Sequence, residues 1–249
     1  MNTLTTTIQV NNVSMMFNLS RDKVMGLKEY VVKALKRQLH YDEFWALKDV
    51  SFEVYKGEVL GILGLNGSGK STLLKLIAGV FKPTKGNIVV NGSISPLLEL
   101  GAGFDPEFSA KENVYMNGAM YGHSPKYMDT IYNELMDFAD LWEFEDVPLK
   151  NFSSGMYARL GFAVATQVKP DVLIIDEILG VGDYKFQEKC EARVKDMLSD
   201  GATVLLVSHG LGTIKTMCSR AVLLSKGELV YIGSVDDVCS VYQDGNALL

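Results

Sequence analysis

A glycine-rich loop at residues 64–72 constrains this chain more than any other feature. It reads Gly-Leu-Asn-Gly-Ser-Gly-Lys-Ser-Thr, a full match to G-x-x-x-x-G-K-[ST], and it directly follows an apolar run at residues 59–63. Glycines give the backbone conformations in which successive N–H groups point into one concavity that can hold phosphate oxygens. The next residues have helical apolar spacing and reach Gly79 at a cap position. The sequence predicts a buried strand, a phosphate-binding loop and a helix, in that order.

The loop residues indicate a nucleotide triphosphate as ligand. Lys70 adds a point charge, and the hydroxyl of Ser71 is expected on Mg²⁺. The helix that starts at about Gly69 directs its positive end at the β-phosphate. The other loop residues expected to bind the nucleotide are Gly64, Leu65, Asn66, Gly67, Ser68 and Thr72.

Composition excludes several classes of protein. The 249 residues are 47% hydrophobic, which suits one large domain or a domain with a subdomain. A net charge of −6 gives no global basic character that would favour nucleic acid as a partner. Cys190, Cys218 and Cys239 are far apart and odd in number, which argues against a disulfide framework and a zinc site and indicates a reducing compartment.

No segment reads as a signal peptide or a membrane span. The first residues lack a basic region followed by an apolar one, and the apolar runs fall short of the ~20 residues that cross a bilayer. We therefore expect a cytoplasmic protein, with any membrane-spanning part on another chain.

The first half of the chain predicts an antiparallel subdomain with an insertion. Residues 8–17 and 47–54 alternate between apolar and polar, as half-exposed strands do, and Asn91-Gly92 after a short strand is a hairpin signal. Residues 22–40, within an insertion at 18–44, read as an amphipathic, net basic helix. This helix either packs as an ordinary surface helix or lies against a membrane or a membrane partner.

The remainder predicts a helical subdomain at about residues 100–168, followed by alternating strands and helices. Such alternation is typical of a parallel sheet covered on both faces. The expected helices are 110–121, 125–140, one from about 154, 184–199 and 211–218, and the expected strands are 172–175, 203–207 and 221–224.

Three further motifs complete the candidate site. Asp176 and Glu177 follow an apolar strand, where two acids are unfavourable unless a cation such as Mg²⁺ lies beside them. Asp176 is expected to hold the metal, and Glu177 to polarise the water that attacks the γ-phosphate. His209 follows another strand and is expected to bind the γ-phosphate or Glu177. Residues 152–156, Phe-Ser-Ser-Gly-Met, read by themselves as a serine-capped helix start.

Taken together, these motifs resemble the nucleotide-binding subunit of ATP-binding cassette (ABC) transporters over roughly residues 8–235. The resemblance implies an α/β fold: a P-loop NTPase (RecA-like) parallel-sheet core with an N-terminal antiparallel subdomain and an inserted helical subdomain, in a single ABC ATPase domain over 1–249. It identifies 64–72 as Walker A, 172–177 as Walker B, 152–156 as the signature and His209 as the switch histidine. It also implies a homodimer in which Ser153, Ser154 and Gly155 contact ATP held by the opposite subunit.

Departures from the common family pattern indicate one branch. Glu99 stands near the place of the Q-loop glutamine, and Asp183 is left as the D-loop acid. The chain resembles the ATPases of exporters of teichoic acids or O-antigens in two segments, Leu-Glu-Leu-Gly-Ala-Gly-Phe and Ser-Ser-Gly-Met. Those ATPases also carry a gate helix where residues 22–40 lie. Phe17 matches the adenine-stacking aromatic by position, with Phe44 and Trp45 as rivals.

The resemblance implies an ATPase at the cytoplasmic face of the membrane, bound to two integral-membrane permease subunits, that exports a lipid-linked polysaccharide. An importer or drug exporter shares all of the ATP chemistry and stays an alternative. A soluble ABC ATPase that acts on ribosomes or DNA is disfavoured, because such proteins need two cassettes or a long coiled coil.

Overall fold

The computed structural model describes residues 5–20, 41–97, 100–167, 170–176, 183–207 and 210–245. The predicted helix at 22–40 and the site candidates Glu99, Glu177 and His209 lie outside these residues. Among the described helices, none is long and apolar enough to span a bilayer.

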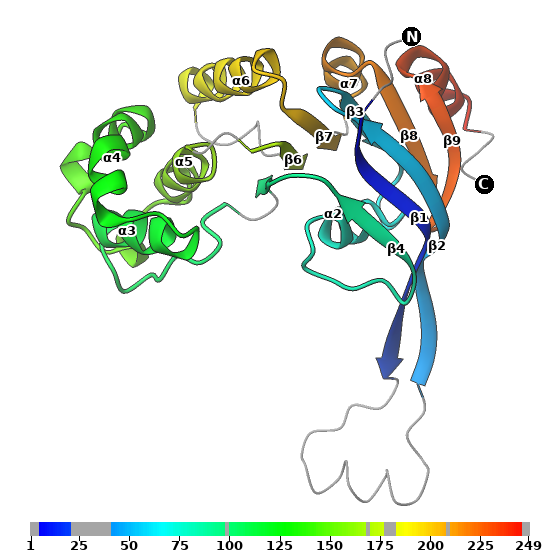
Figure 1. The fold of residues 1–249 in the computed structure, drawn as a ribbon, viewed down its shortest axis with the longest axis horizontal. Coiled ribbons are helices and arrows are strands. Elements are labelled where there is room, and N and C mark those ends of the chain that lie inside the picture. The colour runs from blue at the N-terminus through cyan, green and yellow to red at the C-terminus, as the bar shows by residue number, and fades with distance from the viewer. Residues whose placement is uncertain are drawn as a thin grey trace, which may run out of the picture.

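A six-stranded sheet forms the centre of the molecule, as Figure 1 shows. Its five neighbouring strands β5, β6, β7, β3 and β8 run parallel, and β9 pairs antiparallel with β8 at one edge. The parallel sheet predicted from the second half of the sequence is therefore confirmed. The strands are β3 Val59–Leu63, β5 Ile94–Leu97, β6 Val172–Asp176, β7 Thr203–Val207, β8 Arg220–Ser225 and β9 Glu228–Ser234.

Both faces of this sheet are covered. One face packs Ile62, Ile174 and Val222 against α2 (Lys70–Ile77) and a second, antiparallel sheet. The other face packs Leu173 and Leu223 against helices that follow later in the chain. These helices are α6 Tyr184–Ser199, α7 Leu211–Met217 and α8 Val235–Asp244. Burial on both faces explains why these strands read as continuous apolar runs.

The second sheet has three strands in the order β2, β1, β4, with bounds Tyr41–Tyr55, Thr6–Ser20 and Lys85–Val90. Strands β1 and β2 project beyond β4 as a two-stranded ribbon (Figure 1), in which Asn18 pairs with Glu43 and Leu19 with Asp42. The predicted insertion at 18–44 was therefore wrong at both ends, since 18–20 and 41–44 are strand. A ribbon without a buried face imposes no alternation on its sequence, which hid these strand ends.

The predicted hairpin at Asn91-Gly92 was wrong. Strand β4 pairs with β1 in one sheet, whereas β5 pairs with β6 in the other, so the turn transfers the chain between sheets. Asp171 fixes this crossing, because its Oδ2 accepts the Ser93 N–H at 2.8 Å and the Ser93 hydroxyl at 2.9 Å. The turn dipeptide was visible in the sequence, but the choice of partner strand depended on contacts distant in sequence.

The helical subdomain has its own apolar core, separate from the two faces of the central sheet. Serine residues at 109, 124 and 153 cap its three helices, each accepting a backbone N–H from the first turn. The predicted helices are confirmed, with bounds α3 Ala110–Met120, α4 Pro125–Ala139 and α5 Ser154–Ala165. Two short 3-10 turns, η1 Trp142–Phe144 and η2 Leu149–Asn151, connect α4 to α5.

We expect replacement of Asn113 by Ala to destabilise the helical subdomain. The side chain of Asn113 is fully buried, its amide donates to the carbonyls of Asp105, Phe108 and Ser109, and its Oδ1 accepts the Asp105 N–H at 2.7 Å. Loss of these partners leaves buried backbone groups unsatisfied, at a cost of about 2 to 3 kcal/mol. Urea unfolding measures the change, with the exposed Asn133→Ala of α4 as the matched control. An unfolding midpoint equal to that of the control would contradict the expectation.

Candidate functional site

The glycine-rich loop lies at the carboxyl end of β3 and leads into α2. A Cβ atom on Gly64 would lie 2.4 Å from the carbonyl oxygen of Leu224, and one on Gly69 would lie 2.7 Å from that of Ala46. Gly69 also has a φ of 105°, which residues with side chains rarely adopt. The turn therefore requires glycine at both positions, and it brings the loop against the β2 backbone.

The interior of the loop suits an anion. Lys70 is only 8% exposed, and its ammonium donates to the carbonyls of Gly64 at 2.8 Å and Leu65 at 3.0 Å. The buried hydroxyl of Ser68 has no hydrogen-bond partner among the described residues. Gly69 begins α2 without a side-chain cap among those residues, so the helix N-terminus keeps its donors for a ligand. A cation, an unsatisfied hydroxyl and a helix N-terminus together fit the phosphates of a nucleotide.

Parallel pairing brings the other motifs to the same edge of the sheet. Strand β7 lies between β6 and β3, and Asp176 at the end of β6 is paired with Val207 at the end of β7. Glu177 and His209 follow these two strand ends directly in the sequence. Within the described residues, no group of three or more His, Cys, Asp or Glu side chains is placed to hold a metal ion. The side chains of Asp176, Glu177 and His209 are not among those described, so their roles stay predictions.

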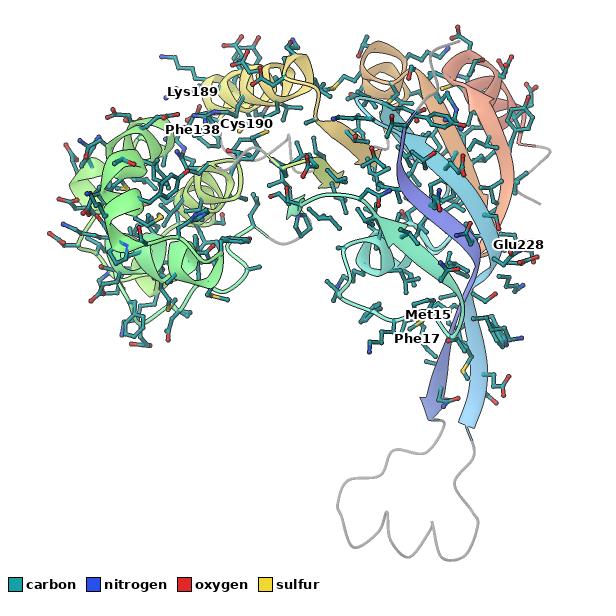
Figure 2. All side chains as sticks on the ribbon, viewed as in Figure 1. Met15, Phe17, Phe138, Lys189, Cys190 and Glu228 are labelled. Carbon is teal, nitrogen blue, oxygen red and sulfur yellow. The ribbon has the colours of Figure 1, made fainter. Side chains whose placement is uncertain are left out.

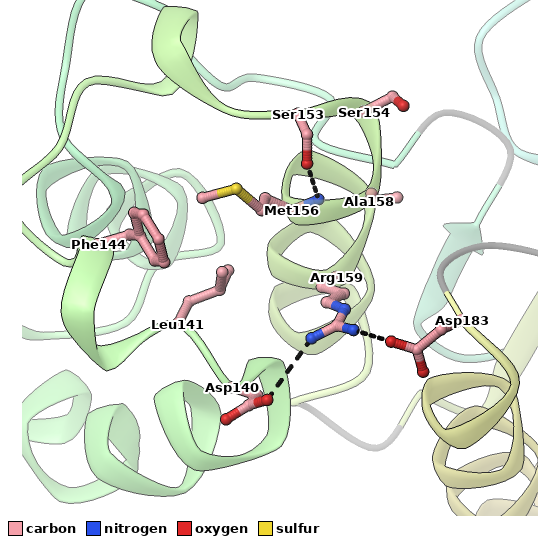
Figure 3. Close-up of a pocket in the computed structure, with 10 residues that line it drawn as sticks. Asp140, Leu141, Phe144, Ser153, Ser154, Met156, Ala158, Arg159 and Asp183 are labelled. Carbon is pink, nitrogen blue, oxygen red and sulfur yellow. Dashed lines mark hydrogen bonds and ion pairs between the residues drawn. The ribbon is translucent and has the colours of Figure 1, made fainter.

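The signature residues Ser153–Met156 line a groove of about 580 Å³ at the start of α5 (Figure 3). The hydroxyl of Ser153 accepts the Met156 N–H at 3.2 Å, which confirms the predicted serine-capped helix start. The groove is partly apolar, with Leu141 and Phe144 on its wall. Its complete lining is Asp140, Leu141, Phe144, Ser153, Ser154, Gly155, Met156, Ala158, Arg159 and Asp183.

Arg159 connects three elements at this groove, as Figure 3 shows. Its guanidinium forms an ion pair with Asp183, lies 3.6 Å from the carboxylate of Asp140 after α4, and stands 5.3 Å from the ring centre of Phe186. Asp183 in turn caps α6 by accepting the Phe186 N–H at 3.0 Å. The expected D-loop acid is thus joined to the signature helix. Sequence reasoning missed Arg159, although its place four residues after Gly155 puts it on the same helical face.

The groove at Ser153 and the phosphate loop are separate in one chain. None of the loop residues 64–72 lines the groove. Figure 1 shows α5 within the helical subdomain and α2 under the central sheet. The groove and the phosphate loop therefore do not meet within one chain.

The aromatic candidates for adenine stacking lie on the β1–β2 ribbon. Phe17 is paired with Phe44, so their side chains share one face, whereas Trp45 points to the opposite face. Figure 2 shows Phe17 where the ribbon leaves the body of the protein. Its ring meets Phe81 edge-on at 5.9 Å, and the Trp45 ring lies 5.0 Å from the Lys85 ammonium. A base that stacks on Phe17 would therefore lie on the face that carries Phe44.

The three cysteines are free thiols. Burial raises the pKa of Cys190 and of Cys218 to about 12. Both thiols are therefore protonated at neutral pH, so they are poor nucleophiles and poor metal ligands.

We expect the part of the stability that depends on the charge of Asp183 to be lost in acid. The hydrogen bond from the Phe186 N–H and the charge of Arg159 hold the pKa of the Asp183 carboxyl below its usual range. A lowered folded pKa stabilises the protein above the unfolded value of about 4, and this stabilisation is lost as the pH falls through the folded value. Urea midpoints of wild type and Asp183→Ala should differ most at about pH 7, and the difference should shrink as the pH falls below the unfolded value of about 4.

Asp183→Asn provides the control for this expectation, because asparagine keeps the helix cap and removes only the charge. Its midpoint should lie between those of the wild type and Asp183→Ala at neutral pH. A difference between wild type and Asp183→Ala that stays constant down to low pH would contradict the assignment.

Comparison with known proteins agrees with this geometry. The family model described as ABC transporter matches residues 47–180. The O-antigen export system ATP-binding protein RfbB of Klebsiella pneumoniae is 40% identical over 96% of this chain and 98% of its own length. The teichoic acids export ATP-binding protein TagH of Listeria monocytogenes is 38% identical over 90% of this chain and 64% of its own length.

Solved structures show the same fold at lower sequence identity. An ATP-binding subunit of an ABC transporter matches 97% of this chain and 94% of its own, with a TM-score of 0.74 and 24% identity. The dimeric cassette MJ0796, bound to ADP and phosphate in a post-hydrolysis state, matches 92% of this chain and 98% of its own, with a TM-score of 0.71 and 23% identity. With its glycine-rich loop, its signature groove and relatives of this similarity, the chain belongs to the ABC transporter family.

Proposed function

We propose that this protein is the ATP-hydrolysing subunit of an ABC exporter that moves a lipid-linked cell-wall or surface polysaccharide across the cytoplasmic membrane. The observation that carries the proposal is the alignment with the O-antigen export protein, which is 40% identical over 96% of this chain and 98% of its own length. The teichoic acid relative adds a second polysaccharide export system. The nucleotide chemistry rests on the phosphate loop, in which the Lys70 side chain and the hydroxyl of Ser68 are buried.

We assign the hydrolytic roles to residues at the carboxyl edge of the sheet. Lys70 neutralises phosphate charge, Ser71 and Asp176 hold Mg²⁺, Glu177 orients and polarises the attacking water, and His209 donates to the γ-phosphate. When bound, Mg²⁺ neutralises charge on the phosphate oxygens. The pairing of β6, β7 and β3 supports the assignment, since it gathers the backbone positions that precede these side chains. Glu99 stands nearest to the place of the Q-loop glutamine in the sequence, and Phe17, Phe44 and Trp45 stay alternatives for stacking on adenine.

Two copies complete each other's sites in this proposal. The start of α5 has a helix dipole and the N–H of Gly155, while Ser153 and Ser154 add hydroxyls, so this end suits the γ-phosphate of ATP held by the second copy. The separation of this groove from residues 64–72 in one chain supports the arrangement. Asp183 lines the same groove and faces the second copy when the dimer closes. ATP then holds the two copies together, and hydrolysis releases them.

Loss of the Glu177 carboxylate is expected to trap an ATP-bound dimer. Glu177→Gln keeps the size of the side chain and removes its basicity, so hydrolysis should fall by about a hundredfold or more while ATP binding stays unchanged. Phosphate release measures turnover, and size-exclusion chromatography in Mg-ATP measures the dimer. Glu188→Gln on exposed α6 is the control and should behave as the wild type. Undiminished turnover in Glu177→Gln would remove Glu177 from the base role.

The membrane partner tests the transport assignment. We expect the tagged chain, purified from gently solubilised membranes of its native host, to bring down an integral-membrane permease at equal stoichiometry without a solute-binding protein. Deletion of that permease should leave the polysaccharide inside the cell. Copurification with a solute-binding protein would indicate an importer, and unchanged surface polysaccharide after the deletion would indicate another exporter class.

A further inference from the structure

Helix α5 contacts the segment that follows β5 at very short range. The buried Gly161 lies in the middle of the helix, and a Cβ atom there would lie 2.7 Å from the backbone nitrogen of Gly101 and 3.0 Å from the carbonyl carbon of Leu100. Both neighbours are backbone atoms, which cannot move aside as the end of a side chain can. Only glycine at 161 therefore allows the two backbones this approach.

Tyr157 holds the same segment one helical turn earlier. Its hydroxyl donates to the carbonyl of Gly101 at 3.3 Å, and its ring meets Phe104 edge-on at 5.5 Å. Gly101 has a φ of 77°, and a Cβ atom on it would lie 2.5 Å from the Tyr157 ring. The carbonyl of Gly101 also accepts the Phe104 N–H at 2.9 Å, which closes a tight turn against the helix.

Two further hydrogen bonds extend the contact. The Ser95 hydroxyl on β5 donates to the carbonyl of Ala165 at 2.9 Å, and the buried Asn117 amide of α3 donates to the carbonyl of Ala102 at 3.0 Å. Residues 157, 161 and 165 are four apart, so they form one face of α5. This face thus contacts Ser95 of β5 and the segment 100–104, which α3 also holds through Asn117.

The contact joins residues 100–104, which follow β5 in the sequence, to helix α5. The same helix begins with the signature residues, which we assign to the ATP of the second copy. We propose that Tyr157 and Gly161 are positioning residues for ATP hydrolysis, because they fix residues 100–104 to the signature helix so that both move as one unit. The inference rests on the proposed function and deepens it. Neither residue touches the nucleotide in this assignment.

The chain offers matched glycine substitutions that test the role of Gly161. Gly161→Ala forces two backbones apart. Gly118→Ala in α3 meets only the flexible side chain of Met128, and Gly212→Ala in α7 meets nothing within 4 Å. Tyr157→Phe removes one hydroxyl and keeps the ring packing. ATP affinity, kcat, KM and the unfolding midpoint are measured on the full chain, together with amide hydrogen exchange of the nucleotide-free protein.

We expect Gly161→Ala to bind Mg-ATP within about twofold of wild type and to lose about tenfold or more in kcat, since small misplacements of reacting groups have effects of this size. Tyr157→Phe should lose about fivefold in kcat, as expected for one hydrogen bond, with little change in unfolding midpoint. Both the Phe104 amide and the Met156 amide should exchange faster in Gly161→Ala than in wild type. Neither amide should exchange faster in Gly118→Ala or Gly212→Ala.

Other outcomes would overturn the inference. Wild-type kcat in Gly161→Ala would show that the contact has no role in positioning. An equal loss of kcat in Gly118→Ala, or a parallel loss of ATP affinity, would show general damage to the fold. If wild type does not hydrolyse ATP, the proposed function fails. Faster exchange of the Phe104 amide without the Met156 amide in Gly161→Ala would show that the two segments do not move as one unit. The proposed function would be unaffected by that result.

Discussion

The parallel pairing of β3 with β7 and β8 is the constraint on which the rest of the molecule depends. Because β3 is buried on both faces and paired along both edges, its carboxyl end has a fixed position. The loop after it turns sharply within the space that Gly64 and Gly69 leave open, and α2 then starts with its donors directed at the loop. A phosphate site made of backbone groups needs such a rigid support, since these groups cannot adjust as side chains do.

The same pairing explains why motifs that are far apart in the sequence follow strand ends at one edge of the sheet. Carboxyl ends of neighbouring parallel strands meet at one edge, so the ends of β6 and β7 lie at the same edge as the loop after β3. The helical subdomain interrupts the chain between these strands. It has its own core, but α5 also packs Phe162 into the core of the central sheet. Through this double membership, α5 connects the core of the helical subdomain to the core of the central sheet.

Two contacts of α5 differ in kind. Arg159 joins the helix to Asp183 through charge at a partly exposed position, where ions in solution screen the interaction. Tyr157 and Gly161 join the helix to residues 100–104 through a hydrogen bond and close packing, which salt does not weaken. A charged contact can exchange partners when a second copy approaches. A packed contact transmits displacement instead, because close-packed atoms have no free volume into which they can yield.

Sequence alone determined the phosphate loop, the parallel core and the helical subdomain. Each follows from local chemistry: glycines for the loop, continuous apolar runs for strands buried on both faces, and serine caps with helical spacing for α3, α4 and α5. Tertiary structure decided the partner of β5, the true ends of β1 and β2, the pairing of Arg159 with Asp183 and the approach of Gly161 to Gly101. These features depend on contacts between segments that are far apart in the sequence. A pattern of neighbouring residues does not specify those contacts.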